Sequence, residues 1–302
     1  MTAPSVAGSR TCVACGEQVV PTRAIRFRKA GLEIARCSSC GLMFRATLPT
    51  EAELAEIYDS SYFFSAVRDT GGQGYDDYLA DADLHRGVAQ KRLALLAHFV
   101  SPGLLLDVGA AAGFFVAEAV AAGWDARGID ISAGMVEWGR EHLGVLLERQ
   151  SLAALDAQPG TFDAVVMWDY LEHALDPAID LARAHELLRP NGVVALSTGD
   201  AGSPAAKLSG SRWHLLTPRH HNYFFTVPSL RRLLGRLGFE VVYARHPGVR
   251  YSGRYLAYKL RTVLDAALVR RAADAVANSR LGALRVPVNL GDIVTVVARK
   301  RA

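Results

Sequence analysis

The sequence predicts an α/β protein with a doubly wound, mostly parallel sheet of seven strands, helices on both faces and a small N-terminal module. Three observations predict this fold. Residues 104–115 join an apolar run to a helical pattern through a glycine-containing turn, as a buried strand feeding a helix does. Strand and helix patterns then alternate to about residue 246. All four cysteines precede residue 41 and mark a separate unit before the sheet.

The N-terminal module, residues 1–48, carries two C-x-x-C pairs. Cys12 and Cys15 are separated from Cys37 and Cys40 by 21 residues. This spacing is typical of a zinc ribbon, because each pair directs two thiolates at one tetrahedral ion. Four thiolates leave no open position on Zn²⁺, so a structural ion is expected. Two disulfides are the alternative, which a cytoplasmic location would disfavour.

Composition limits the class of protein. With 302 residues, half of them apolar, the chain can form a full α/β domain and a smaller unit. We find neither the apolar core of a signal peptide nor an apolar run near the roughly 18 residues of a membrane span, and we expect a cytoplasmic protein.

The net charge of +4 is unevenly distributed. Residues 1–50 hold seven Lys/Arg against two Asp/Glu, and residues 245–302 hold twelve against three, so both ends are basic and the middle is acidic. Basic ends indicate either solvated faces or contact with nucleic acid, an anionic lipid surface or a phosphorylated substrate.

Residues 49–100 are expected to form a helical lid and linker. Thr50 and Glu53 predict a capping box for a short helix ending at residue 57. Apolar residues at helical spacing predict a long helix over 75–100. Between these helices, Tyr62 belongs to an aromatic cluster that either packs one module on the next or forms part of a lid.

The sheet domain is expected over residues 101–246, completed by a last strand near the C-terminus. Its predicted strands are 104–108, 125–131, 144–148, 162–168, 193–198, 239–244 and 293–297. Its predicted helices are 113–122, 133–142, one that begins after Pro177 and one over 226–238. The last two strands are expected to pair antiparallel at one edge of the sheet.

A basic helical insert is predicted between the last two strands, within the C-terminal segment 247–302. Leucines recur there at every fourth residue with arginines around them, which is the pattern of an amphipathic basic helix. The residues are Leu256, Leu260, Leu264 and Leu268, with Arg254, Arg261, Arg270 and Arg271. The helix either packs on the core or binds a partner subunit, an anionic lipid or a phosphorylated carrier.

The glycine-containing turn at residues 107–113 resembles a loop of a known protein family. Asp107, Gly109, Ala111 and Gly113 occupy the places of a D-x-G-x-G-x-G loop, with alanine at the middle glycine. The stretch resembles the cofactor loop of class I S-adenosylmethionine (SAM) methyltransferases, which implies a Rossmann-like domain. Small residues let the amino-acid end of a ligand approach the backbone, and Asp107 can accept from its ammonium group. Asp130 closes the next strand and is placed to hold ribose hydroxyls.

The same resemblance implies further cofactor contacts. They are expected from Ile131 and Trp168 at strand ends, from Ser151 and Leu152 near the adenine, and from Tyr62 in the lid. A dinucleotide loop fits less well, because G-x-G-x-x-G needs glycines two and then three residues apart.

Two segments are expected at the acceptor. Glu172 and His173 lie in an "EH … DP" segment, and residues 213–226 resemble a "W … P … H-x-x-x-F-[ST]" segment, both similar to those of small-molecule methyltransferases. The matching residues of the second segment are Trp213, Pro218, His221, Phe225 and Thr226. Each segment follows a strand end that faces the ligand crevice. We expect His221 to be the general base, with His173 and Glu172 as the other catalytic candidates. A structural, hydrogen-bonded role is the alternative for either histidine.

The sequence therefore predicts a SAM-dependent methyltransferase with a zinc ribbon, similar to enzymes of sugar, surface-polysaccharide and natural-product pathways. A sulfonium methyl is already activated, so the protein must align the acceptor and remove a proton from a hydroxyl. We expect O-methylation of a sugar or another small hydroxylated acceptor.

Other functions compatible with the sequence are an rRNA or tRNA base methyltransferase and a non-catalytic SAM-binding protein. The ribbon has only Phe27 and Phe44 for base stacking, which disfavours nucleic acid. A homo-oligomer or a surface contact through the basic C-terminal segment would fit the charge pattern.

Overall fold

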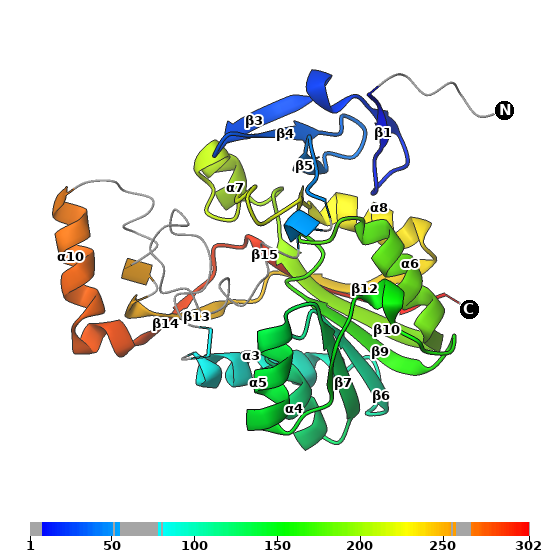
Figure 1. The fold of residues 1–302 in the computed structure, drawn as a ribbon. Coiled ribbons are helices and arrows are strands. Elements are labelled where there is room, and N and C mark those ends of the chain that lie inside the picture. Colours follow the sequence, from blue (N-terminus) through cyan, green and yellow to red (C-terminus); the bar gives the residue numbers. More distant parts are fainter. Residues whose placement is uncertain are drawn as a thin grey trace.

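A seven-stranded sheet forms the centre of the computed structural model, which describes residues 8–50, 52–54, 78–79, 81–254, 256–257 and 267–301 (Figure 1). The strand order is β12-β15-β10-β9-β6-β7-β8. β15 runs antiparallel to β10 and β12, and the pairs among β10, β9, β6, β7 and β8 are parallel. This confirms the predicted α/β fold. The strands are β6 (Leu104–Val108), β7 (Asp125–Asp130), β8 (Leu147–Arg149), β9 (Phe162–Trp168), β10 (Leu188–Gly199), β12 (Phe239–Arg245) and β15 (Ile293–Lys300).

Helices cover both faces of the sheet. Side chains alternate along a strand, so Ala164 and Val166 of β9 pack with α3, α4 and α5, whereas Val165 and Met167 pack with α6 and α8. Because both faces are covered, β9 is apolar over most of its length. The helices are α3 (Ala82–Leu96), α4 (Phe114–Ala121), α5 (Ala133–Leu143), α6 (Pro177–Leu187) and α8 (Val227–Arg236).

Several predicted helix starts are confirmed by their caps. The Asp176 carboxylate accepts from two amides at the start of α6, and Pro177 follows as its first residue. The capping box of Thr50 and Glu53 also forms, with Glu53 N donating to Thr50 Oγ1 at 3.2 Å and Thr50 N donating to Glu53 Oε2 at 2.7 Å. The remainder of that predicted helix, residues 55–57, lies outside the described residues.

Some boundaries differ from the predictions. α3 begins at Ala82 rather than at residue 75, and residues 75–77 lie outside the described part of the chain. β8 begins three residues later than expected, because Gly144 takes φ +63° and ends α5. α6 ends at Leu187, before Pro190, and β10 has an irregular start around Asn191 at φ +66°.

The predicted insert contains a helix, and it also contains two strands that were not predicted. Its ends form an antiparallel pair, β13 (Val249–Ser252) and β14 (Arg285–Val288), in addition to α10 (Ala267–Ala277) and η4 (Arg280–Ala283). In Figure 1, α10 (orange) projects away from the central sheet. Leu268 is 80% exposed, so the core does not cover it.

The other residues of the predicted amphipathic helix differ in burial. Leu256 is half-buried, and the side chains of Arg254, Arg270 and Arg271 are exposed. Leu260, Leu264 and Arg261 lie outside the described residues. Among the helices described, none is both long enough and apolar enough to cross a membrane.

The N-terminal ribbon docks on the sheet domain through a shared sheet. β11 (Tyr223–Phe224), a strand of the sheet domain, pairs antiparallel with β5, which gives the order β11-β5-β4-β3. The ribbon (blue in Figure 1) therefore lies against the segment that precedes α8. The ribbon elements are β1 (Arg10–Thr11), β2 (Gln18–Val19), η1 (Pro21–Arg23), β3 (Ile25–Lys29), β4 (Leu32–Arg36) and β5 (Met43–Arg45).

The ribbon and the sheet domain also share one hydrophobic core. Phe44 and Leu42 of the ribbon pack in the same buried cluster as Leu230 and Leu233 of α8. Between β10 and β11 the chain forms α7 (Pro204–Ser209) and η3 (Gly210–Arg212), which were not predicted. The Ser203 hydroxyl, which caps α7 ahead of a proline, is a start signal visible in the sequence.

Candidate active site

The loop between β6 and α4 needs its glycines. Gly109 and Gly113 have φ of +75° and +79°, in the left-handed region. A Cβ at Gly109 would lie 2.7 Å from the Tyr170 ring, and one at Gly113 would lie 2.9 Å from Val145. Ala111, at the family's middle glycine, also takes a positive φ of +47°, a strain of about 1–2 kcal/mol for a residue with a Cβ.

Two acids border this loop. Asp107 lies near the carboxyl end of β6 and is 2% exposed. Burial raises its pKa to about 7; the charge of Arg92 opposes this shift, and the charge of Asp130 adds to it. Asp130 accepts from Ala111 N and Ser132 N, both at 2.8 Å, so it fixes the loop across β7. Burial raises the pKa of Asp130, and these two amides oppose the shift. Carboxylate oxygens have further lone pairs, so Asp130 can also accept from ribose hydroxyls.

A cover over the loop was missed from the sequence. The Tyr78 ring stacks on His85 at 4.1 Å and lies 5.9 Å from Phe114, and Tyr78 packs against the cluster that contains Ala111. Burial raises the pKa of Tyr78, and the charges of Asp107 and Asp130 add to the shift. Tyr62, the residue we expected in a lid, lies outside the described residues.

The residues expected at the adenine have structural contacts. The Ser151 hydroxyl accepts from Ala154 N at 3.3 Å and caps η2 (Leu152–Ala154). Leu152 is 1% exposed and packs in the core, so a cofactor contact there would come from its backbone. Ile131, directly after β7, has an exposed side chain beside Asp130.

A charged network lies at the carboxyl ends of β9 and β10. Trp168 packs 5.5 Å from Phe115, and the Arg92 guanidinium lies 4.5 Å above its ring. Arg92 Nη2 donates to Asp169 Oδ2 at 2.7 Å and to Ser197 Oγ at 2.9 Å. Burial alone would raise the pKa of Asp169, but the Arg92 charge and the hydrogen bonds from Arg92 and Ser197 together outweigh burial, and the pKa is lowered. The network was not predicted, because α3 and β10 contribute residues far from Asp169 in the chain.

The structure brings the three catalytic candidates together. One ligand atom each of Glu172, His173 and His221 lies within 4.8 Å of the others, and the two imidazole rings meet edge to face at 4.7 Å. Glu172 is 6% exposed, and its Oε2 has no hydrogen-bond partner among the described residues. Burial raises the pKa of Glu172 to about 8, with a contribution from Asp169, and burial lowers the pKa of His173 to about 4.

Backbone carbonyls orient both histidines. His173 Nδ1 lies 3.0 Å from the His220 carbonyl, and His221 Nδ1 lies 3.0 Å from the Leu215 carbonyl. A carbonyl oxygen only accepts, so each Nδ1 carries the proton and each neutral ring has its lone pair on Nε2. The environment therefore gives both imidazoles the same tautomer, with the basic nitrogen opposite the carbonyl.

The ribbon supports the segment that holds His221. Asn222 N donates to the Glu172 carbonyl at 2.7 Å, which ties this segment to the turn after β9. On the other side, Arg45 N donates to the Asn222 carbonyl at 2.9 Å, and Arg10 donates to the Tyr223 hydroxyl at 3.1 Å. None of these contacts was predicted, because a two-residue strand has no sequence periodicity.

Trp213, the tryptophan of the predicted acceptor segment, has a packing role. Trp213 is 3% exposed, and its Nε1 donates to Asp292 Oδ2 at 2.9 Å, which anchors the segment to the start of β15. Phe225 is fully buried, and Thr226 caps α8 in a capping box with Ser229.

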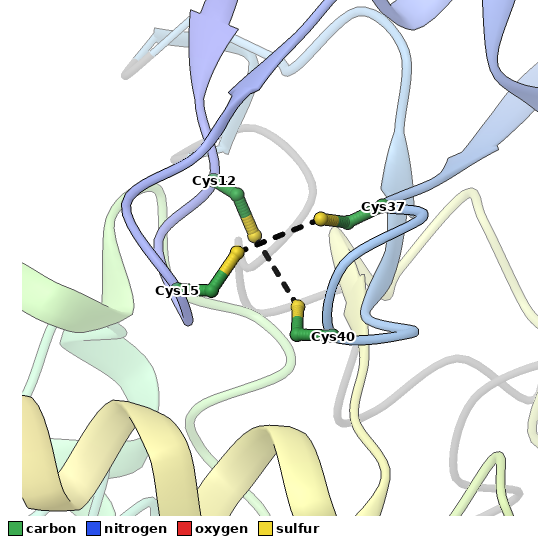
Figure 2. Close-up of side chains that lie close together, drawn as sticks. All are labelled: Cys12, Cys15, Cys37 and Cys40. Carbon is green, nitrogen blue, oxygen red and sulfur yellow. Dashed lines mark hydrogen bonds between the residues drawn. The ribbon is translucent and has the colours of Figure 1, made fainter.

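The four cysteines of the ribbon converge on one point (Figure 2). The Sγ atoms of Cys12 and Cys40 are 3.6 Å apart, as are those of Cys15 and Cys37. With Zn–S bonds of about 2.3 Å, tetrahedral thiolates lie about 3.8 Å apart, whereas disulfide sulfurs lie about 2.05 Å apart. The cysteines are free, and their geometry fits a tetrahedral ion rather than the alternative of two disulfides.

Comparison with known proteins matches residues 80–244 to a family described as a methyltransferase domain. This stretch is more than half of the chain and includes the glycine loop, Asp130 and the turn after β9. The chain belongs to the SAM-dependent methyltransferases.

Relatives of this methyltransferase include two named ubiquinone biosynthesis O-methyltransferase. The chain is 31% identical over 206 residues to that of Aromatoleum aromaticum, covering 64% of this chain and 82% of the relative. It is 39% identical over 99 residues to that of Methylococcus capsulatus, a match that spans 31% of this chain and only 42% of the relative.

A solved structure supports the fold of the methyltransferase. It is the 1,6-didemethyltoxoflavin-N1-methyltransferase of Burkholderia thailandensis with bound 1,6-didemethyltoxoflavin and S-adenosylhomocysteine. The superposition has a TM-score of 0.52 at 20% identity and covers 92% of this chain and 99% of that chain.

The candidate site thus has two adjoining halves. The glycine loop and Asp130 form one half, and the cluster of Glu172, His173 and His221 forms the other. Tyr170 joins them, because its ring lies where a Cβ of Gly109 would be and because it belongs to the same turn as Glu172.

Proposed function

We propose that this methyltransferase transfers the methyl group of SAM to a hydroxyl of a small acceptor. The observation that carries the proposal is the cluster of Glu172, His173 and His221, on a turn that packs against the glycine loop. A hydroxyl placed at the cluster would face both a proton acceptor and a sulfonium methyl held at the loop. Alignment for in-line displacement and loss of the hydroxyl proton are the two requirements of O-methylation.

The geometry of the site supports a proposed role for each residue. We propose that Gly109, Ala111 and Gly113 admit the amino-acid end of SAM, with Asp107 facing its ammonium group and Asp130 facing its ribose. The lone pair on His221 Nε2 is the proposed proton acceptor, since the Leu215 carbonyl favours the tautomer that places the lone pair on that nitrogen.

The atom and the class of acceptor are part of the proposal. The names of the relatives from Aromatoleum and Methylococcus support oxygen as the methylated atom. The acceptors we propose are sugars and other small hydroxylated natural products, because the ribbon and the acceptor segments resemble those of enzymes in such pathways. RNA is less favoured, because Phe44 is 1% exposed and Phe27 packs against a hydrophobic cluster, so neither ring is presented to a base.

We also propose that the four ribbon cysteines hold a structural Zn²⁺. Their sulfur separations of 3.6 Å support this ion, and four thiolates would leave no position for a substrate.

The test is methyl transfer from SAM with a ¹³C-labelled methyl group to a panel of nucleotide sugars, glycosides and other hydroxylated metabolites. The expected product carries the label in a methoxyl group, identified by its NMR chemical shift. His221→Ala should lower turnover by about 100-fold, within the range for loss of an acid–base group, and leave the affinity for S-adenosylhomocysteine unchanged.

The matched control is His142→Ala, an exposed histidine on α5 whose ring nitrogen lies 2.9 Å from the Trp138 carbonyl. Label on nitrogen or carbon would overturn the assignment of oxygen. An unchanged rate in His221→Ala would overturn the role of His221.

A further inference from the structure

The turn after β9 carries Glu172 and His173 on backbone that belongs to neither a helix nor a strand. Residues 169–176 lie between the end of β9 and the start of α6, so their carbonyl groups are not paired along a helix or a sheet. Buried carbonyls need hydrogen-bond partners, and a turn without them would be free to shift. The position of the two candidate side chains therefore depends on what the carbonyls of this turn accept from.

Asn222 donates to three successive carbonyls of the turn. Its backbone amide donates to the Glu172 carbonyl at 2.7 Å, and its Nδ2 donates to the carbonyls of His173 and Ala174 at 2.9 and 3.3 Å. An amide nitrogen carries two hydrogens, so both are used, and the side-chain oxygen is left to accept. Asn222 is 1% exposed, so water does not compete for these bonds.

Tyr223 donates to the next carbonyl. Its hydroxyl donates to the Leu175 carbonyl at 3.0 Å, and its backbone amide donates to the Glu172 carbonyl at 3.2 Å. Burial raises the pKa of Tyr223 to about 12, although the charge of Arg10 opposes this shift, so the hydroxyl keeps its proton at neutral pH. Together, Asn222 and Tyr223 satisfy the four carbonyls from residue 172 to residue 175.

Two arginines of the ribbon set the direction of these bonds. Arg10 Nη2 donates to the Tyr223 hydroxyl at 3.1 Å, so the single hydroxyl hydrogen is left for the Leu175 carbonyl. Arg45 Nη1 faces the side-chain oxygen of Asn222 at 3.5 Å, so the amide nitrogen faces the turn. Arg10 Nη1 also donates to the Arg45 carbonyl at 3.2 Å, which joins the two contacts.

These contacts explain part of the positive charge of the ribbon. Arg10 and Arg45 are two of its seven basic residues, and both are half-buried. The Arg10 guanidinium also lies 4.4 Å above the ring of Phe44, so it is packed inside the molecule rather than presented to a partner. The charge of these two arginines therefore acts on residues 222–223.

We propose that Asn222 and Tyr223 are positioning residues that hold the turn after β9 in place. Arg10 and Arg45 orient them, which makes the ribbon part of the support of the acceptor side. The inference rests on the proposed role of the turn in methyl transfer. Displacement of a reacting group by about 1 Å can lower a rate about 100-fold, so a loosened turn should lower kcat more than cofactor affinity.

The experiment compares Asn222→Asp and Tyr223→Phe with the wild type. Aspartate has the size of asparagine but lacks the Nδ2 hydrogens, and phenylalanine keeps the ring of Tyr223 without its hydroxyl. Each variant thus removes donors and keeps the packing, and Tyr223→Phe keeps the test open if Asn222→Asp does not fold. The matched control is Tyr243→Phe, because this half-buried tyrosine packs beside Phe99 in the cluster that faces α3.

Two measurements are made on each protein. Hydrogen exchange of a peptide that covers residues 169–176 is followed in the complex with S-adenosylhomocysteine, without acceptor. Steady-state kinetics with SAM and the acceptor found in the labelled panel give kcat and the KM for SAM.

Exchange should be at least about fivefold faster in Asn222→Asp and Tyr223→Phe, which is the effect of one ordinary hydrogen bond. Their kcat should fall by about 10- to 100-fold while the KM for SAM changes by less than about threefold. Tyr243→Phe should match the wild type in both measurements. Unchanged exchange, an unchanged kcat, or a loss of cofactor affinity as large as the loss of kcat would overturn the positioning role.

The contribution of the ribbon is tested by combining Arg10→Gln with Tyr223→Phe. If Arg10 acts through the Tyr223 hydroxyl, the loss of kcat in the double variant is smaller than the product of the two single losses. A loss equal to that product would overturn the part of Arg10.

Exchange is measured without acceptor, so it does not depend on the proposed reaction. Label on nitrogen, together with faster exchange and a lower kcat in the two variants, would overturn O-methylation and uphold the positioning role. O-methylation with an unchanged kcat in both variants would overturn the positioning role and leave the proposed function standing.

Discussion

Loss of the zinc ion that we propose for the ribbon is expected to loosen the acceptor side of the candidate site and to spare the cofactor side. The perturbation is the double substitution Cys37→Ser and Cys40→Ser, which removes one of the two knuckles. β5 of the ribbon follows this knuckle directly and pairs with β11, next to His221. The glycine loop has no such dependence, because Gly109 N and Ala110 N donate to the Ile129 carbonyl of β7.

The magnitude follows from the contacts that would be lost. Roughly four hydrogen bonds join the ribbon to residues 222–224, including Arg45 N to the Asn222 carbonyl and Arg10 to the Tyr223 hydroxyl. At a net value of about 1 kcal/mol each, they restrain the segment by about 4 kcal/mol. Their loss would raise the opening equilibrium of the segment by up to about 1,000-fold.

Amide hydrogen exchange measures this opening directly. Residues 215–226 should lose protection in the double variant, while residues 104–113 keep theirs and the affinity for S-adenosylhomocysteine changes by less than about threefold. Arg28→Ala is the matched control, because it removes only an exposed ion pair to Glu33 on the same ribbon. Unchanged protection of residues 215–226 would refute the coupling between the ribbon and the acceptor segment.

Two further predictions concern the cofactor loop. Because the pKa of Asp107 is about 7, binding of SAM at pH 7 should release about half a proton as its ammonium group favours the charged carboxylate, and affinity should rise as the pH rises through 7. Calorimetry in buffers of different ionisation enthalpy measures the release, and Asp107→Asn should abolish it; equal release in that variant would exclude Asp107 as the source. Gly113→Ala should destabilise the protein by about 1–3 kcal/mol, because φ is +79° and the new Cβ would lie 2.9 Å from Val145. Denaturant unfolding tests this, and an unchanged midpoint would show that the loop adapts.

Local patterns account for the part of the fold that could be predicted. β6, the glycine loop and α4 follow one another in the sequence. The apolar strand, the turn glycines and the helical spacing that predict them therefore lie within one short segment. The cysteine spacing is also a local pattern, because the two cysteines of each C-x-x-C pair come together within a single turn. Asp130 was found because it ends a strand that follows at the interval expected for a β-α-β unit.

Long-range contacts account for what could not be predicted. Arg92 reaches Asp169 from a different helix, and the pairing of β11 with β5 joins segments almost 180 residues apart. The sequence indicates Glu172 and His221 as candidates for catalysis, but it does not show that their side chains meet. The four-residue strands β13 and β14 were missed because the leucine spacing between them favoured a helix over the whole insert.

Leu152, which follows β8, shows another limit of prediction from the sequence. Leu152 follows a strand end, where a cofactor contact and a core position have the same sequence pattern. Packing decides between them, and here the side chain is buried with the residues of the core.

Calorimetric titration of the zinc-replete protein with S-adenosylhomocysteine tests the central claim most directly, because it needs no acceptor. The account predicts one site per chain with micromolar affinity, weakened by Asp130→Ala, which removes both the support of the glycine loop and the proposed ribose contact. Absence of binding in the wild type would contradict the placement of the cofactor at this loop and every residue role derived from it.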